Sequence, residues 1–149
     1  MDMQWTKRPA TVDDGEFACT LHRAAYQAVV IKQFGQWDEV RQQQFFEDKW
    51  RPEAYEIVEI QGRPIGVLCV TKTQYEVRIV EIQLLPEYQG RGIGTELLQR
   101  ELQLADEQGL PVRLQVLLKN QARALYQRLG FRVYDKTDTH VLMERACPL

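Results

Sequence analysis

The sequence has few cysteines and few histidines, and neither residue type forms a recognisable motif. Cys19, Cys69 and Cys147 stand without a CxxC pair, and three cysteines cannot all pair within one chain. We interpret them as reduced thiols of an intracellular protein, because Cys19 and Cys69 lie in apolar patterns. His22, His140 and these cysteines lack the spacing of metal ligands, so we expect no metal site.

Long apolar segments and a large net charge are also absent. No run approaches the roughly 18 apolar residues that span a bilayer, and the opening MDMQWTKRPA lacks the apolar stretch of a signal peptide. The formal net charge is −2, from 19 basic and 21 acidic residues, which leaves no broad basic excess for nucleic acid. We therefore expect a cytoplasmic protein that binds neither membranes nor nucleic acid.

The periodicity that is present predicts a mixed α/β domain over residues 1–149, without an internal repeat or linker. The expected order is strand, two helices, three strands, helix, strand, helix and two strands. Antiparallel meanders joined by helical crossovers indicate a mixed sheet covered by helices. The strands are expected near residues 4–8, 55–60, 64–70, 75–85, 112–118, 131–135 and 140–144, and the helices near 11–35, 38–50, 91–108 and 120–130.

The strand over residues 75–85 changes its phase. Val77 and Ile79 are apolar in one alternation, whereas Ile82 and Leu84 belong to the other, with the slip near Val80. Because a slip in a period of two is typical of an extra residue in one strand, we expect a β-bulge there.

Three glycines, Gly90, Gly92 and Gly94, stand where this strand gives way to the next helix. The first N–H groups of a helix have no intrahelical partner, and the helix dipole adds roughly half a positive charge there. Glycines leave these amides uncovered, so the junction suits a phosphate or pyrophosphate, with Arg91 at its mouth. The spacing matches neither GxxxxGK[ST] nor GxGxxG, and by itself it indicates a close-packed turn equally well.

Two segments carry a family resemblance. QGRGIG, residues 89–94, resembles the acyl-CoA signature Gln/Arg-x-x-Gly-x-Gly/Ala that follows the fourth strand of the GCN5-related N-acetyltransferases (GNAT). NQARALYQRLGFR, residues 120–132, is similar to the second signature of that family. The separation of the two segments and the elements between them also fit this family. The resemblance covers essentially the whole chain. The matching positions of the second segment are Asn120, Ala124, Leu125, Tyr126, Gly130 and Phe131.

The resemblance implies a twisted mixed sheet of about seven strands and about four helices, whose splayed central strands admit acetyl-CoA. Tyr126 would point its hydroxyl towards the thioester sulfur, and Asn120 would contact the far wall of the wedge. Main-chain groups of Ile82, Leu84 and Leu85 would pair with the pantetheine arm, as a strand edge pairs with a peptide. The pyrophosphate would lie on the amides around Gln89, Gly90, Arg91, Gly92, Ile93, Gly94 and Thr95.

Acetylation of an amine needs a proton acceptor for the ammonium, donors for the tetrahedral oxyanion and a proton for the departing thiolate. The resemblance assigns the proton donor to Tyr126, for which a packed core tyrosine is the alternative interpretation. Glu81, just before the wedge, is the candidate base, and a solvent-facing carboxylate is its alternative. Glu56 and Glu59 are weaker candidates, and Gln115 occupies a position where some relatives carry a base.

The acceptor site is expected at the two N-terminal helices and the last strand. Tyr26, Trp37 and His140 are its candidate residues, with ordinary packing as the alternative for each. Aromatic rings beside acids suit a cationic, partly apolar amine of a small molecule or peptide.

These features predict an acetyl-CoA-dependent N-acetyltransferase. A non-catalytic acyl-CoA-binding sensor is the second interpretation, and release of free thiol with an acceptor would separate the two. The sequence leaves open the acceptor, the base, whether the acyl group is strictly acetyl and the oligomeric state, including a homodimer.

Overall fold

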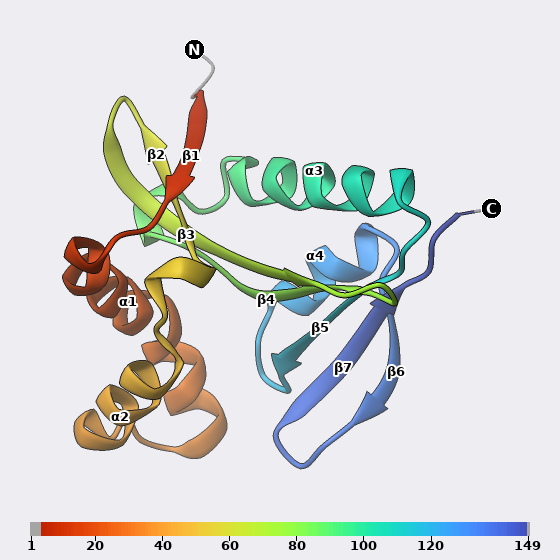
Figure 1. Ribbon diagram of the computed structural model, residues 1–149. Coiled ribbons are helices and arrows are strands. Elements are labelled where there is room, and N and C mark those ends of the chain that lie inside the picture. The colour runs from red at the N-terminus through yellow and green to blue at the C-terminus, as the bar shows by residue number, and fades with distance from the viewer. Residues whose placement is uncertain (1–3, 149) are drawn as a thin grey trace.

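A seven-stranded mixed sheet runs through the computed structural model, which describes residues 4–148 (Figure 1). The strand order is β1-β2-β3-β4-β5-β7-β6, and all neighbours pair antiparallel except β4 and β5, which are parallel. The predicted mixed sheet is therefore confirmed. The strands are β1 Trp5–Pro9, β2 Glu56–Ile60, β3 Arg63–Lys72, β4 Val77–Leu84, β5 Val112–Leu117, β6 Arg132–Lys136 and β7 His140–Arg145.

Helices cover both faces of this sheet. α1 (Gly15–Phe34) and α2 (Glu39–Lys49) lie on one face, and α3 (Ile93–Glu107) and α4 (Ala122–Arg128) on the other (Figure 1). Successive residues of β2 and β3 point to opposite faces, so the core forms on both sides. The α1 side holds Ala18, Leu21, Tyr55, Ile57, Val67 and Cys69, and the α3 side Val58, Ile65, Leu68, Leu84, Ile93 and Leu97.

The expected bulge lies in β4. Val70 of β3 pairs with Ile79, but Cys69 pairs with Glu81, which leaves Val80 as an extra residue. The bulge explains the phase change in the sequence and is confirmed at the predicted position.

This bulge decides which side chains reach each face. Val80 packs against the core cluster on the α1 side, and the next residue, Glu81, contacts Tyr26 of α1. Ile82 packs against the clusters on the α3 side. The extra residue therefore places a carboxylate on the α1 face without moving the rest of the strand out of the core.

The central strands diverge as the family resemblance implied. β4 and β5 pair only at Val77 with Val112 and at Arg78 with Arg113. β5 then pairs with β7 along its whole length, from Val112 to Leu117, and leaves one edge of β4 open. Figure 1 shows the two strands separating beyond their short contact.

The third helix begins two residues later than expected. Pro86–Tyr88 forms a 3₁₀ turn after β4, and Gly92, with φ of +84°, is the N-cap of α3. The left-handed conformation at Gly92 keeps Arg91 outside the helix, because the chain changes direction there.

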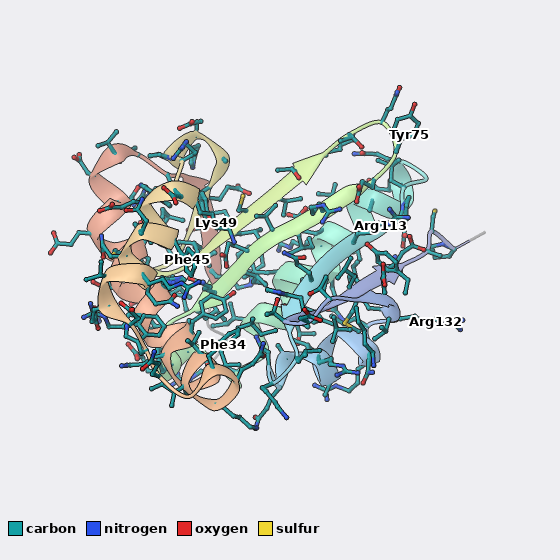
Figure 2. All side chains as sticks on the ribbon, turned by 90° about the horizontal axis from the view of Figure 1, so that it is seen from below. Phe34, Phe45, Lys49, Tyr75, Arg113 and Arg132 are labelled. Carbon is teal, nitrogen blue, oxygen red and sulfur yellow. The ribbon has the colours of Figure 1, made fainter. Side chains whose placement is uncertain are left out.

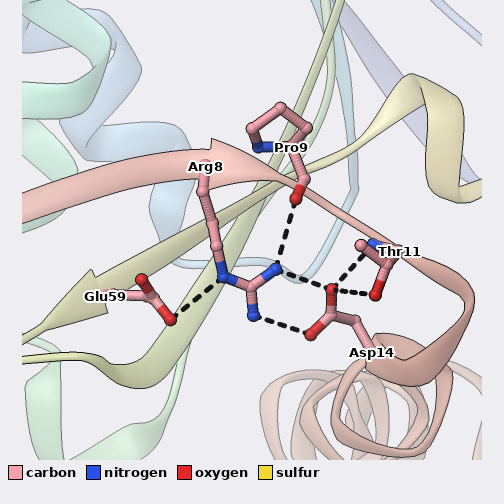
Figure 3. Close-up of polar contacts among 5 residues, drawn as sticks. All are labelled: Arg8, Pro9, Thr11, Asp14 and Glu59. Carbon is pink, nitrogen blue, oxygen red and sulfur yellow. Dashed lines mark hydrogen bonds and ion pairs between the residues drawn. The ribbon is translucent and has the colours of Figure 1, made fainter.

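An ion cluster joins the start of α1 to the first two strands (Figure 3). The guanidinium of Arg8 donates to both carboxylate oxygens of Asp14 at 2.8 Å, to Glu59 at 3.1 Å and to the Pro9 carbonyl at 3.2 Å. Asp14 also accepts a hydrogen bond from the N–H of Thr11 at 2.8 Å. One guanidinium of β1 therefore connects that strand to β2 and to the turn that begins α1.

The hydrogen bonds from Arg8 lower the pKa of Asp14 from 3.8 to about 2, against the opposing effect of its burial. A carboxyl whose pKa is lower in the folded state stabilises the protein above its unfolded pKa. This contribution is lost as the pH falls from about 4 to about 2.

We predict that Asp14→Asn destabilises the protein at pH 7 by about 1–2 kcal/mol, since solvent around Arg8 screens part of the interaction. Urea unfolding across pH 2–7 should show the difference from wild type shrinking towards the acid end. The exposed neighbour Asp13 provides the control variant Asp13→Asn, which should unfold like wild type. A difference that does not change with pH would contradict the assignment.

Gly66 allows β3 and β4 to approach closely. A Cβ at this position would overlap the Gln83 carbonyl oxygen and lie 2.6 Å from Cδ2 of Leu84. We predict that Gly66→Ala lowers the free energy of unfolding by about 1–3 kcal/mol through overpacking. In the control Gly15→Ala, the Cβ would lie 3.4 Å from Nε1 of Trp50 on a helical backbone, so thermal unfolding should change little. Equal midpoints for both variants would argue against a tight contact at Gly66.

Candidate active site

The divergence of β4 and β5 opens a cleft of about 1480 Å³. Its walls come from α1 and α2 on one side, from β4 and β5, and from the first turns of α3 and α4 on the other. Phe34, Phe45 and Lys49 lie on the helical side, as Figure 2 shows from below. Side chains separated by most of the chain length therefore meet in one site.

The first turn of α3 forms one end of the cleft. The first helical hydrogen bond runs from the N–H of Glu96 to the Gly92 carbonyl at 3.0 Å. The N–H groups of Ile93, Gly94 and Thr95 consequently have no acceptor within the helix. A Cβ added at Gly92 would meet no atom within 4 Å, so the space before these amides is open.

One hydrogen bond connects this loop to the end of β4, and another connects that end to β3. The side chain of Gln89 donates to the Leu84 carbonyl at 2.9 Å, and the Leu85 N–H donates to the Ile65 carbonyl at 2.8 Å. Gln89 thus holds the loop against the strand in this structure. The sequence prediction had placed the main chain of Leu84 and Leu85 against a ligand, and these two groups already have partners inside the protein.

Most of the predicted site residues reach the cleft. Ile93 does not, because its side chain is buried in the core and only its N–H faces the junction. Arg91 stacks over the ring of Tyr88, with 5.7 Å between guanidinium carbon and ring centroid. Leu85 packs against the core on the α1 side. Those that line the cleft are Tyr26, Glu81, Ile82, Leu84, Gln89, Gly90, Gly92, Gly94, Thr95, Asn120, Tyr126 and His140.

Trp37 does not line the cleft, so the structure separates it from the other two acceptor candidates. Its ring centroid lies 6.0 Å from that of His22, and its indole N–H donates to Glu39 at 3.0 Å. Trp37 packs in the connection between α1 and α2 because the N-cap at Asp38 turns the chain into α2 there.

Glu81 is buried on the floor of the cleft, with 7% of its surface exposed. Its Oε1 accepts from Nζ of Lys49 at 2.6 Å, and its Oε2 accepts from Tyr26 at 3.1 Å and from Gln83 at 3.0 Å. The strand pattern had allowed a solvent-facing carboxylate as the alternative interpretation, and the structure shows that Glu81 does not face solvent. Sequence reasoning missed Lys49 and Gln83. The sequence could have indicated Gln83, because it lies two residues after Glu81 in the alternation of the strand. Lys49 has no such signal in the sequence around it.

Tyr126 projects from α4 into the same region. Burial, together with the charge of Glu81, raises the pKa of Tyr126 to about 12, so its hydroxyl keeps its proton at neutral pH. Its ring meets Phe131 edge-on at 5.8 Å between centroids, which positions the hydroxyl along the cleft wall. Within residues 4–148 that hydroxyl has no hydrogen-bond partner. It is available to a ligand as a donor.

His140 lines the cleft, and its neighbour Thr139 contacts Gln33 of α1. His140 is half-buried, and burial and the charge of Lys49 lower its pKa, while its Nδ1 lies 2.7 Å from the Thr139 hydroxyl. Gln33 of α1 donates to the Thr139 carbonyl at 2.8 Å and accepts from the Lys119 N–H at 3.0 Å. Gln33 thus connects α1 to the second half of the sheet, a contact that the sequence did not indicate.

Asn120 contacts the beginning of α4, whose N-cap residue is Gln121. Its side-chain oxygen accepts from the N–H of Ala122 at 2.9 Å, at the beginning of α4. The same residue lines the cleft, so it forms part of the wall and also fixes the helix that carries Tyr126.

Comparison with known proteins agrees with this geometry. The model of the acetyltransferase (GNAT) family matches residues 18–131. The chain belongs to the GNAT family. The predicted resemblance is thereby confirmed, and GNAT acetyltransferases use acetyl-CoA.

Individual relatives are distant. A protein from Methanocaldococcus jannaschii, named an uncharacterized N-acetyltransferase, is 34% identical over an alignment of 88 residues that covers 53% of this chain. The match spans 39% of that relative's length. The PaiA N-acetyltransferase from Thermoplasma acidophilum, solved with coenzyme A, superimposes with a TM-score of 0.79 at 19% identity, over 97% of this chain and 99% of that one. The ribosomal-protein-S18-alanine N-acetyltransferase from Escherichia coli gives 0.68 at 20% identity, over 98% and 96%.

In the part of the chain from 4 to 148, no group of three or more His, Cys, Asp or Glu side chains is placed to hold a metal ion. No helix in that part combines the length and the apolar character needed to cross a membrane.

Proposed function

We propose that this GNAT protein is an acetyl-CoA-dependent N-acetyltransferase that acts on a primary amine of a small molecule or peptide. The supporting observation is a single cleft that is lined by the open N-terminus of α3 and by both Glu81 and Tyr126. The first feature suits the donor, and the second suits the acceptor amine and the leaving thiol.

The donor end fits a pyrophosphate. The unpaired N–H groups of Ile93, Gly94 and Thr95 point into open space at the positive end of the α3 dipole. A side chain at Gly92 would fill that space. The free edge of β4 runs from there towards Glu81 and offers main-chain groups along its length to the pantetheine arm.

Acetyl-CoA, when bound, supplies an acetyl group activated as a thioester. Tyr126 holds a proton at neutral pH and can deliver it to the departing sulfur. An N–H on the open edge of β4 can stabilise the oxyanion. Glu81 can take the proton of the acceptor ammonium, which would replace the Lys49 ammonium at its Oε1. Direct attack by the resulting neutral amine needs no enzyme-bound acyl intermediate.

The acceptor side is formed by α1 and α2. Phe34 and Phe45 line it and remain 51% and 50% exposed, and Tyr26 lies deeper, bound to Glu81. Burial and the Glu81 charge raise the pKa of Tyr26, so it remains a neutral donor. These apolar rings beside a carboxylate suit an amine that carries an apolar or aromatic group. The lined surface is larger than an amino group alone would fill.

An acyl-CoA-binding sensor without catalysis is the second candidate. It is favoured by the ion pair of Glu81 with Lys49, which occupies the candidate base. A screen of amines, amino acids, polyamines and peptides for release of free thiol separates the two functions. Only the enzyme releases thiol in proportion to acetylated acceptor.

We predict that Gly92→Glu weakens CoA binding at least about 100-fold, because it places bulk and negative charge before the α3 amides. Gly109→Glu is the matched control, since Gly109 has a similar positive φ of 70° but lies beyond the other end of α3. Calorimetry should show wild-type affinity for the control. Similar affinities for both variants would place the pyrophosphate elsewhere.

We predict that Tyr126→Phe lowers kcat by about 100-fold, the size expected for loss of a general acid, and changes CoA affinity little. The exposed Tyr134 supplies the control Tyr134→Phe, with kcat expected at the wild-type level. The measurement requires an acceptor from the screen and conditions under which chemistry limits turnover. An unchanged kcat for Tyr126→Phe there would rule out its acid role.

A further inference from the structure

The acceptor side of the cleft already contains an amine of the protein itself. Lys49 is the last residue of α2, and its side chain is 49% exposed. Its Nζ nevertheless lies 2.6 Å from Oε1 of Glu81, a carboxylate that is 7% exposed on the cleft floor. The lysine therefore extends from the rim of the cleft to the candidate base.

The other candidate reactive groups line the same cleft as this amine. These groups are Glu81, Tyr126 and His140. Glu81 directly follows the bulge residue Val80, on the part of β4 whose edge is open. An amine and a proton acceptor thus meet in a cleft that a proton donor also lines, beside the open strand edge.

Two other lysines line the cleft and provide a comparison. Lys32 of α1 and Lys119 after β5 are exposed, and within residues 4–148 neither forms an ion pair with a carboxylate. All three lysine side chains are accessible to the same solvent. Lys49 differs from them by the contact with Glu81, so a reaction that depends on the site would select it.

We propose that Lys49 is a self-acetylation site, modified by acetyl-CoA bound in the cleft of the same molecule. The proposal rests on the acetyltransferase function. The Lys49 ammonium gives one proton to Glu81, and the neutral Nζ forms a bond to the thioester carbonyl carbon while the carbon–sulfur bond breaks. The sulfur takes a proton from Tyr126, which regains one from the second N–H of the attacking nitrogen. The products are Nε-acetyl-lysine, CoA thiol and one proton, which Glu81 releases to solvent.

Acetylation would change the acceptor site in two ways. The neutral amide leaves the buried Glu81 carboxylate without its cation, with Tyr26 and Gln83 as its remaining donors. The added acetyl group also occupies space beside Glu81 that an external amine would need. Self-acetylation would therefore slow the acetylation of other amines.

The test incubates the full-length protein with acetyl-CoA and no acceptor, and follows each lysine by peptide mass spectrometry. We expect Lys49 to be acetylated at least about 10-fold faster than Lys32 and Lys119, as an oriented intramolecular reaction should be. With saturating acetyl-CoA, the fraction modified per minute should not depend on protein concentration. Equal rates at the three lysines, or a rate that rises with protein concentration, would overturn the proposal.

Variants separate the site from general chemical reactivity. Gly92→Glu should lose the preference for Lys49, whereas Gly109→Glu should keep it. Lys49→Arg retains a cation next to Glu81 and should show no substitute modification at Lys32 or Lys119. A preference for Lys49 that survives in Gly92→Glu would indicate ordinary lysine reactivity and contradict the proposal.

A second readout does not depend on turnover. After acetyl-CoA is removed, the acetylated protein should melt at a lower temperature than untreated protein and match Lys49→Gln, because both leave Glu81 without its cation. An unchanged melting temperature would count against the assignment to Lys49.

Parallel measurements distinguish failure of this inference from failure of the proposed function. If calorimetry shows CoA binding and an external amine is acetylated, but Lys49 stays unmodified, only the self-acetylation is wrong. If CoA does not bind, both are wrong.

Discussion

The short contact between β4 and β5 is the constraint on which the rest of the site depends. Two residue pairs hold the parallel strands together, and β5 then pairs with β7 instead. A strand edge without a partner inside a protein must find other donors and acceptors. Here the open edge faces a cleft between two helical layers, where an extended ligand can supply them. The bulge at Val80 adds to this arrangement, because it places Glu81 at the same edge on the α1 face.

Burial of carboxylates explains how the first two helices are positioned. Asp14 and Glu81 are both 7% exposed, and each is compensated by a cation and further donors from separate segments. Asp14 joins the start of α1 to β1 through Arg8, and Glu81 joins α1 and α2 to β4. Since an unpaired buried charge is costly, these clusters restrict where the helices can lie. The same charges therefore fix the helical wall of the cleft and give that wall its chemical character.

The two ends of the cleft use different parts of the chain. The end at α3 presents main-chain N–H groups uncovered by glycine, and such groups bind a phosphate whatever the neighbouring side chains are. The end at α1 and α2 is made of side chains, including Tyr26, Lys49 and two exposed phenylalanines. This difference explains why the family of the protein and its acetyl donor follow from short motifs, while no motif names the acceptor.

The sequence by itself determined the order of elements, the bulge near Val80 and the exposed amides before α3, because each is set by residues close together in the chain. Tertiary structure alone decided that Lys49 meets Glu81, 32 residues away, and that Gln33 reaches Thr139 across 106 residues. It also removed Trp37 from the cleft. Local spacing carries no information on such contacts, because they arise only when the sheet brings distant helices to one edge.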